Sequence, residues 1–293
     1  MIATNSVRPG ATTAYRRIQE LGLESKVAEL DLQGFTVLSP AEAQTAALAQ
    51  PLLDRILRVA EERGGRKPDL ARGSSHAGMK SATGQHLFYL LFEDPVFEQA
   101  LMNPPAVALI DYLLGEDSIL SSMTAMVKGP DDEPLKLHSD GAMLPEPFPA
   151  YATVANATYL LSDYSRENGA IFFVPGSHKL CRQPTPAEMQ DAESFFTIEA
   201  PMGSMIVWHG NTWHGAHPRK TSGLRVNLIM YFCRMFVRSQ ESYQGACPPE
   251  VLARNAERFH RFVGEHLWYG WKSEGPDRAK QAALGGIGRG SRT

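Results

Sequence analysis

Short strand-like segments dominate the chain from Ile119 to Cys233, whereas the predicted helices fall mostly before and after them. Helices that precede strands, rather than alternating with them, pack outside an antiparallel sheet. The expected strands cover residues 34–38, 121–128, 135–140, 151–162, 170–174, 196–199, 204–208 and 224–233. About eight short antiparallel strands predict a mainly β fold with packed helices, whose core is a double-stranded β-helix of the jelly-roll or cupin-like kind.

The length of 293 residues allows one large domain or two small ones. We expect a single domain over residues 1–293. Its parts would be a mainly helical N-terminal part, the β-helix core, a C-terminal helical part and a flexible tail, at 1–118, 119–240, 241–281 and 282–293. Residues 1–13, rich in Ser, Thr, Gly and Ala, are expected to be flexible as well.

Helix boundaries are marked by local signals. Ser39-Pro40-Ala41-Glu42 has the pattern of a capping box with proline at the first helical position, and predicts a helix that ends at Gly64-Gly65. Asp94-Pro95 and Asn103-Pro104 predict two more helices, the second ending at Gly115. Thr185-Pro186-Ala187-Glu188 predicts a helix inserted between two strands.

A C-terminal helix is expected from Pro248 onward. Its apolar residues recur with a period near 3.6, at Val251, Leu252, Phe259, Phe262 and Val263. Trp268, Tyr269 and Trp271 follow. Because large aromatic side chains dominate core burial, we interpret this group as a face docked on the barrel, with a binding platform as the alternative.

A candidate metal site lies on the expected strand 135–140. Alternate residues of a strand share a face, so Lys136, His138 and Asp140 should point one way. With one distant histidine, His138 and Asp140 would form a 2-His-1-carboxylate triad, which leaves positions open on a ferrous ion. His-x-Asp alone is a weak signal, because short motifs occur by chance.

Three histidines compete for the second imidazole position. His209, His214 and His217 lie within nine residues of one another. His214 is favoured because it follows a glycine-initiated strand and precedes Arg225 by eleven residues, but the spacing leaves His209 and His217 as alternatives.

Several blocks arrive in the order of one family. Beyond His138-Ser139-Asp140, these are Leu30–Leu38, Asn156–Asp163, Glu167-Asn168-Gly169-Ala170, Pro175-Gly176-Ser177-His178, Met202–Trp208, Trp213-His214-Gly215 and Arg225. Together they resemble the phytanoyl-CoA dioxygenase family of Fe(II)/2-oxoglutarate-dependent oxygenases. The specific part of the resemblance covers roughly residues 119–235.

The resemblance implies a role for several residues. His138, Asp140 and His214 match the iron ligands, and Arg225 matches the basic residue that pairs with the far carboxylate of 2-oxoglutarate. Asn156 stands where the family often has an aromatic residue, and Lys136 where relatives have a polar residue near the co-substrate; a solvated rim lysine is the alternative for Lys136.

The implied reaction uses Fe(II), 2-oxoglutarate and O2 as cofactor and co-substrates. It would hydroxylate or desaturate a C–H bond and release succinate and CO2. Related halogenases replace the carboxylate ligand with a small residue, so the presence of Asp140 favours a hydroxylase or desaturase.

The substrate is expected to be a small or medium organic molecule, such as a lipid-like compound or a natural product. The loop 141–149 lies beside the expected iron site, and its Met143, Leu144 and Phe148 are candidate substrate contacts. With Met123 and Met126 they indicate a largely apolar pocket. Residues 66–84 are a candidate lid, with a solvated connector as the default.

Composition narrows the partners and the compartment. A net charge of −3 gives no electrostatic case for nucleic acid, and no apolar run is long enough for a membrane span. Three scattered cysteines, Cys181, Cys233 and Cys247, predict neither a zinc site nor a disulfide framework and favour the reducing cytoplasm. We expect a monomer or a homodimer.

Two other functions stay open. A cupin-type metalloenzyme that does not use 2-oxoglutarate would keep the triad but would not need Arg225. A non-catalytic jelly-roll binding module would need neither, since a fold does not fix a function.

Overall fold

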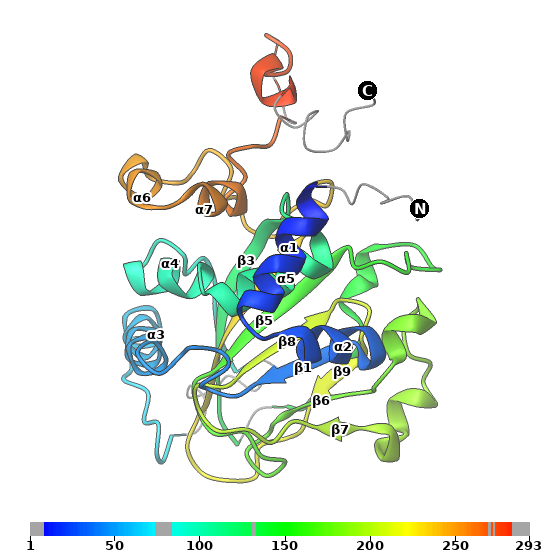
Figure 1. The fold of residues 1–293 in the computed structure, drawn as a ribbon. Coiled ribbons are helices and arrows are strands. Elements are labelled where there is room, and N and C mark those ends of the chain that lie inside the picture. The colour runs from blue at the N-terminus through cyan, green and yellow to red at the C-terminus, as the bar shows by residue number, and fades with distance from the viewer. Residues whose placement is uncertain (1–8, 74–83, 131–132, 269–270, 272, 283–293) are drawn as a thin grey trace.

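The strands of the protein form two antiparallel sheets. A computed structural model describes residues 9–73, 84–130, 133–268, 271 and 273–282 (Figure 1). The six-stranded sheet has the order β1 (Phe35–Leu38), β8 (Met205–His209), β5 (Val154–Leu160), β10 (Arg225–Cys233), β3 (Ile119–Lys128) and β2 (Gln85–Leu87). The four-stranded sheet has the order β4 (Leu135–His138), β9 (His214–Ala216), β6 (Ile171–Phe173) and β7 (Phe196–Thr197).

Helices cover the outer face of the large sheet. Figure 1 shows α5 (Pro104–Leu114) and α1 (Pro9–Glu20) in front of it, with α2 (Glu24–Gln33) beside β1 and β8. The main hydrophobic core lies between these helices, α3 (Ala49–Gly64), α4 (Pro95–Leu101) and one side of the large sheet. On β3, for example, Met123, Ala125 and Val127 belong to this core, so the side chains between them face the smaller sheet.

The predicted fold class is confirmed. The protein is mainly β with packed helices, and its two facing antiparallel sheets form a jelly-roll core flanked by N-terminal and C-terminal helices. Two strands of three residues, β2 and β9, were not predicted, because so short a segment carries no alternation of its own.

Two predicted helix starts are confirmed by their caps. The side chain of Asp94 accepts a hydrogen bond from the Val96 amide at 2.9 Å, and that of Asn103 accepts one from the Ala106 amide at 3.1 Å. Gly65 ends α3 in the left-handed conformation, with φ of 68°, as a glycine C-cap does.

Two predicted capping boxes close turns instead of opening α-helices. The Ser39 amide donates to Glu42 at 2.8 Å, but Gln44 has a left-handed φ of 54° that ends the turn, and α3 begins only at Ala49. The Thr185 amide donates to Glu188 at 2.8 Å, yet only the short 3₁₀ turns η3 (Glu188–Gln190) and η4 (Ala192–Ser194) follow.

The C-terminal helix is split into α6 (Pro249–Arg254) and α7 (Glu257–Phe262). Asn255, between them, is extended and donates its side-chain amide to Glu98 at 2.7 Å and to the Val251 carbonyl at 2.8 Å. Phe259 and Phe262 are fully buried in the main core, so the docking of this helical face is confirmed.

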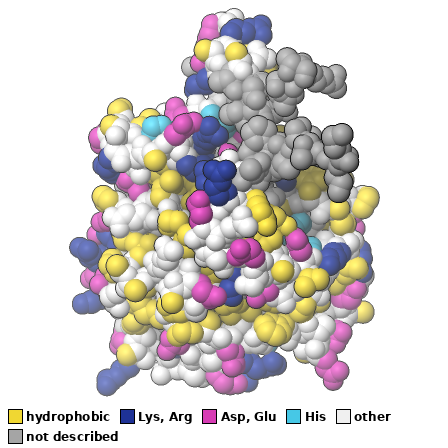
Figure 2. Space-filling view, in the orientation of Figure 1, with side chains coloured by type: hydrophobic (Ala, Val, Ile, Leu, Met, Phe, Trp, Pro, Cys, Tyr) yellow, Lys and Arg dark blue, Asp and Glu magenta, His cyan; other side chains and the backbone are white. Residues whose placement is uncertain are grey.

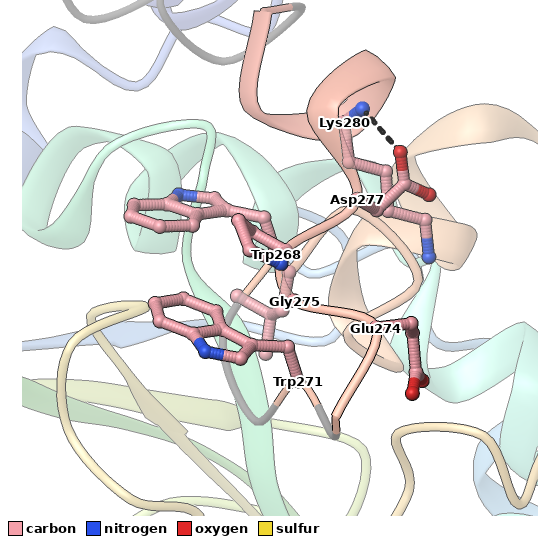
Figure 3. Close-up of a pocket in the computed structure, with 8 residues that line it drawn as sticks. Trp268, Trp271, Glu274, Gly275, Asp277 and Lys280 are labelled. Atoms are coloured by element: carbon pink, nitrogen blue, oxygen red, sulfur yellow. Dashed lines mark hydrogen bonds between the residues drawn. The ribbon is translucent and has the colours of Figure 1, made fainter.

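Of the tryptophans that follow α7, Trp271 does not dock on the barrel. Figure 3 shows Trp268 and Trp271 with their indole rings parallel, and the ring centroids are 5.6 Å apart. Trp271 is 52% exposed, so its prediction as part of a docked face is wrong: the rings pack on each other. Tyr269 lies outside the described residues.

Three further expectations concern the ends and the candidate lid. Helix α1 begins at Pro9, within the segment 1–13 that was expected to be flexible, while 1–8 lie outside the described part. Residues 74–83 of the candidate lid and 283–293 of the tail also lie outside it. Among the described residues, no helix has the length and apolar character to cross a membrane. On the face in Figure 2, acidic and basic side chains are interspersed.

Candidate functional site

Three predicted ligands meet between the two sheets. His138 at the end of β4, Asp140 just after it and His214 at the start of β9 have donor atoms within 4.8 Å of one another. Each histidine Nε2 lies 3.8 Å from an oxygen of the Asp140 carboxylate. Among the described residues this is the one group of three or more His, Cys, Asp or Glu side chains that could hold a metal ion.

Backbone carbonyls fix how the two imidazoles face the site. His138 Nδ1 lies 2.8 Å from the Lys136 carbonyl, and His214 Nδ1 lies 3.0 Å from the Thr212 carbonyl. A carbonyl only accepts, so Nδ1 carries the proton in both rings and Nε2 is left as the ligand atom. Burial lowers the pKa of His214 to about 4, which keeps that ring neutral, as metal binding requires.

Asp140 is not on the strand, contrary to the prediction. Strand β4 ends at His138, and Ser139 caps a 3₁₀ turn, η1 (Asp140–Met143), by accepting from the Gly141 amide at 3.1 Å. The Asp140 amide donates to the Gly210 carbonyl at 3.0 Å, which fixes the position of the backbone.

The predicted orientation of Lys136 is also wrong. Leu135 pairs with Ala216 and His138 with His214, so β4 has one residue more than β9 between these pairs. Such a β-bulge reverses the alternation of side chains. Leu135 therefore lines the cavity with His138, whereas Lys136 is exposed and does not.

Two side chains hold the carboxylate of Asp140. Asn156 Nδ2 donates to Oδ2 at 2.8 Å and Trp208 Nε1 donates to the same oxygen at 3.2 Å. Asn156 and Trp208 are paired neighbours on β5 and β8, so the sheet register brings both donors to one oxygen. Asn156 thus contacts a predicted ligand, and the role of Trp208 was not predicted.

The alternative histidines lie elsewhere. His209 follows Trp208 on β8 and so points to the opposite side of the sheet, where its Nδ1 accepts from the Asn211 amide at 3.0 Å. His217 Nε2 lies 2.9 Å from the Thr197 hydroxyl. Neither histidine belongs to the group of donor atoms around Asp140.

The triad opens into a cavity of about 480 Å3. The inner face of the large sheet forms one wall, with Ile206 and Trp208 from β8, Asn156 and Thr158 from β5, Arg225, Asn227, Ile229 and Tyr231 from β10, and Ser122, Thr124 and Met126 from β3. The period of two along each strand predicts this set once the register is known.

Arg225 is a buried cation without an acidic partner among the described residues. Its side chain lines the cavity and is 3% exposed. Nη1 donates to the Gly169 carbonyl, and the guanidinium carbon lies 5.4 Å from the centroid of the Tyr164 ring. Its Nε is buried and has no hydrogen-bond partner, and the buried Thr158 hydroxyl on the same wall also lacks one. Such groups are costly unless a ligand satisfies them.

The predicted substrate contacts lie outside this cavity. Phe148 is buried and packs near Gly141, and Leu144 is half-buried; neither lines the cavity, because η1 turns the loop away after Asp140. The side chain of Met143 lies outside the described part of the structure. Of the two β3 methionines, Met126 lines the cavity, whereas Met123 points into the core.

A second pocket, of about 270 Å3, lies in the C-terminal segment. Trp268 and Trp271 line it with Glu274, Asp277 and Lys280 (Figure 3). The Lys280 amide donates to Asp277 at 3.0 Å. This second pocket is lined by none of the three candidate metal ligands, His138, Asp140 and His214.

Comparison with known proteins identifies the family. The family model described as Phytanoyl-CoA dioxygenase (PhyH) matches residues 30–227. Dioxygenase af480 of Aspergillus fumigatus is 30% identical over 168 residues, which cover 56% of this chain and 53% of that protein. An uncharacterized protein of Mycobacterium tuberculosis is 27% identical over 184 residues, covering 60% of this chain and 64% of that protein. The chain therefore spans less than two thirds of the length of these curated relatives.

Solved structures share the fold. HygX from Streptomyces hygroscopicus, with nickel and 2-oxoglutarate bound, has a TM-score of 0.58 at 16% identity, covering 74% of this chain and 88% of that one. The non-heme alpha ketoglutarate dependent carbocyclase SnoK has a TM-score of 0.55 at 18% identity, covering 72% and 84%. Because the family model matches more than half of its length, the chain belongs to the phytanoyl-CoA dioxygenase family.

Proposed function

We propose that this protein is an iron(II)- and 2-oxoglutarate-dependent oxygenase. It would hydroxylate or desaturate a C–H bond of a small or medium organic molecule and release succinate and CO2. Family membership supports this reaction class, and so do the names of relatives, which include a probable alpha-ketoglutarate-dependent hypophosphite dioxygenase of Stutzerimonas stutzeri.

One observation carries the proposal: the buried guanidinium of Arg225, which has no acidic partner among the described residues, shares a cavity with the His-Asp-His triad. Two neutral imidazoles and one carboxylate suit Fe(II) and leave positions open. A dicarboxylate with one end at those positions and the other at Arg225 would satisfy both. A cupin-type enzyme that does not use 2-oxoglutarate would not need a buried arginine that lacks an acidic partner among the described residues.

Each residue of the site would have a distinct role. His138 Nε2, Asp140 and His214 Nε2 would hold the iron, while Asn156 and Trp208 fix the carboxylate. Arg225 would bind the far carboxylate of 2-oxoglutarate, and the free Thr158 hydroxyl would donate to it. Bound iron with 2-oxoglutarate supplies the oxygen activation that oxidises the substrate. Ile206 and Ile229 flank Thr158 on the cavity wall and exclude water.

The proposal also covers the substrate, the domain organisation and the location of the protein. The substrate is a small molecule, and the chain forms one domain. The three cysteines are free thiols, which supports a reducing, cytoplasmic location.

The test is turnover without a substrate. Purified protein with Fe(II), 2-oxoglutarate, ascorbate and O2 should form succinate slowly through uncoupled decarboxylation. Asp140→Ala should abolish this while the protein stays folded by circular dichroism, and His209→Asn should retain it. Succinate formation that survives in Asp140→Ala, or its absence from the wild type, would refute the proposal.

A further inference from the structure

The cavity continues beyond the residues assigned to iron and 2-oxoglutarate. In the large sheet, β3 and β2 lie on the far side of β10 from β5 and β8, which carry Asn156 and Trp208. We call this part the β3 subsite; its members are Ser122, Thr124 and Met126 of β3, His86 of β2, and Phe88 and Gln240 beside them.

Hydrogen-bonding groups in the β3 subsite are available to a ligand. The hydroxyl of Thr124 makes no hydrogen bond to any described residue, although the residue is only 6% exposed. The Nε2 atom of His86 is buried and has no partner. The Ser122 hydroxyl donates to Gln240 Oε1 at 2.6 Å, which leaves the amide NH2 of Gln240 as a donor. Buried polar groups such as the Thr124 hydroxyl and His86 Nε2 are normally satisfied.

None of the six side chains that make up the β3 subsite is a carboxylate, an ammonium or a guanidinium. Glu241 lines the same end of the cavity, but its carboxylate accepts from the Tyr89 amide at 2.6 Å, from the Met123 amide at 2.9 Å and from the Tyr243 hydroxyl. Burial lowers the pKa of His86, so this imidazole is neutral at pH 7. Among the described residues that line the cavity, Arg225 is the one permanent cation; it lies on β10 opposite Lys128 in the sheet register, and the proposed function assigns it to 2-oxoglutarate.

Apolar surface completes the subsite. Met126 lies opposite His86 in the sheet register, and the His86 ring lies 4.1 Å from the Phe88 ring, centroid to centroid. Phe88 is 53% exposed, so it stands at the mouth of the cavity. An entering group would therefore meet the exposed Phe88 ring and Gln240 amide first and the buried Thr124 hydroxyl deeper inside.

We propose that the β3 subsite binds the substrate, and that the part of the substrate that enters it is an uncharged organic group with hydrogen-bonding oxygens. An anion there would face the Glu241 carboxylate, while the one permanent cation of the described cavity lining, Arg225, is assigned to 2-oxoglutarate. A cation would have to compete with the three protein donors that already hold the Glu241 carboxylate. This inference rests on the proposed function, because it assigns the other half of the cavity to 2-oxoglutarate.

The experiment uses three probes of one size: cyclohexane-1,2-diol, cyclohexanecarboxylate and cyclohexylammonium. Each is added to the full-length protein loaded with Mn(II) and 2-oxoglutarate under anaerobic conditions. Paramagnetic broadening of the probe proton resonances then reports binding near the metal. Calorimetry of 2-oxoglutarate binding to the Mn(II) protein comes first, and its failure would count against the proposed function alone.

The diol should show Mn(II)-dependent broadening about tenfold or more above that of either charged probe, because an unpaired charge is costly to bury. Thr124→Val combined with His86→Phe should remove the effect without changing 2-oxoglutarate affinity, whereas Thr124→Ser should keep it. Equal or stronger broadening of a charged probe would overturn the inference. So would a diol that is not broadened, or one that is broadened equally in the double variant.

Discussion

The amide of Asn156 donates a hydrogen bond of 2.8 Å to Oδ2 of Asp140, from a strand that carries no metal ligand itself. Trp208 Nε1 reaches the same oxygen at 3.2 Å, so Asp140 is oriented by two neighbouring strands of the large sheet. A carboxylate held in this way presents its other oxygen, Oδ1, toward His138 Nε2 at 3.8 Å. The geometry of the candidate iron site is therefore set by residues that would not touch the iron.

Removing this support should weaken metal binding. Asn156→Leu is expected to lower metal affinity by about 10–100-fold, the usual effect of losing a partner of a ligand. Trp208→Phe keeps an aromatic ring but removes the N–H. It should lower metal affinity less than Asn156→Leu, because the Trp208 hydrogen bond is longer. Calorimetric titration with Co(II) measures both. Thr158→Val on the same strand is the matched control; wild-type affinity in both Asn156→Leu and Trp208→Phe would contradict this account.

Protonation of His209 should lower the stability of the protein as the pH falls. Burial lowers its pKa to about 4 from an unfolded value near 6.5. As the pH falls, the unfolded state therefore binds a proton at His209 before the folded state does. The stability present above about pH 6.5 is lost as the pH falls toward 4. Between pH 7 and 4.5 the loss from this residue should be about 2–3 kcal/mol.

His209→Asn tests this, because its side-chain oxygen can replace Nδ1 as the acceptor for the Asn211 amide. The free energy of unfolding, from urea titrations at pH 7 and 4.5, should fall less in the variant than in the wild type. Equal pH slopes would show that His209 remains unprotonated or is not buried in solution.

Gly215 should be needed for the packing of β9 between β4 and β6. A Cβ there would lie 2.7 Å from the Leu135 carbonyl oxygen and 2.6 Å from Phe172 Cζ. Gly215→Ala should therefore cost about 1–3 kcal/mol of stability and weaken metal binding through the adjacent His214. Gly22→Ala, where a Cβ meets nothing within 4 Å, should leave metal affinity unchanged. Wild-type metal affinity in Gly215→Ala would contradict this packing.

Much of the fold followed from local patterns. Asp94 and Asn103 were identified as helix caps because a cap depends on a side chain and the next few residues. The orientation of Lys136 was mispredicted because a β-bulge opposite β9 is a property of strand pairing and leaves no trace in the alternation.

The candidate site was also predicted only in part. Its histidines and Asp140 lie in recognisable motifs, and the structure brings them together. Trp208, Thr158 and His86 are brought to the cavity by the register of the large sheet, to which no local signal points. The expected contacts Leu144 and Phe148 were chosen by proximity in sequence to Asp140, and the 3₁₀ turn η1 directs them elsewhere.

The buried charge of Arg225, which has no acidic partner among the described residues, is proposed to bind the far carboxylate of 2-oxoglutarate. Arg225→Ala should bind Fe(II) normally but lose 2-oxoglutarate affinity by at least about a hundredfold, since a lost buried charge pair costs ~3–5 kcal/mol. Arg225→Lys should recover part of it, because an ammonium lacks the planar two-point contact. Arg219→Lys is the control, because that guanidinium donates to three backbone carbonyls and does not line the cavity.

The most direct measurement is an anaerobic titration of 2-oxoglutarate into the Fe(II) protein, followed by its charge-transfer absorbance. We predict saturation for the wild type and for Arg219→Lys, a curve shifted to at least about a hundredfold higher concentration for Arg225→Ala, and an intermediate curve for Arg225→Lys. Superimposable curves for the wild type and Arg225→Ala would contradict the account.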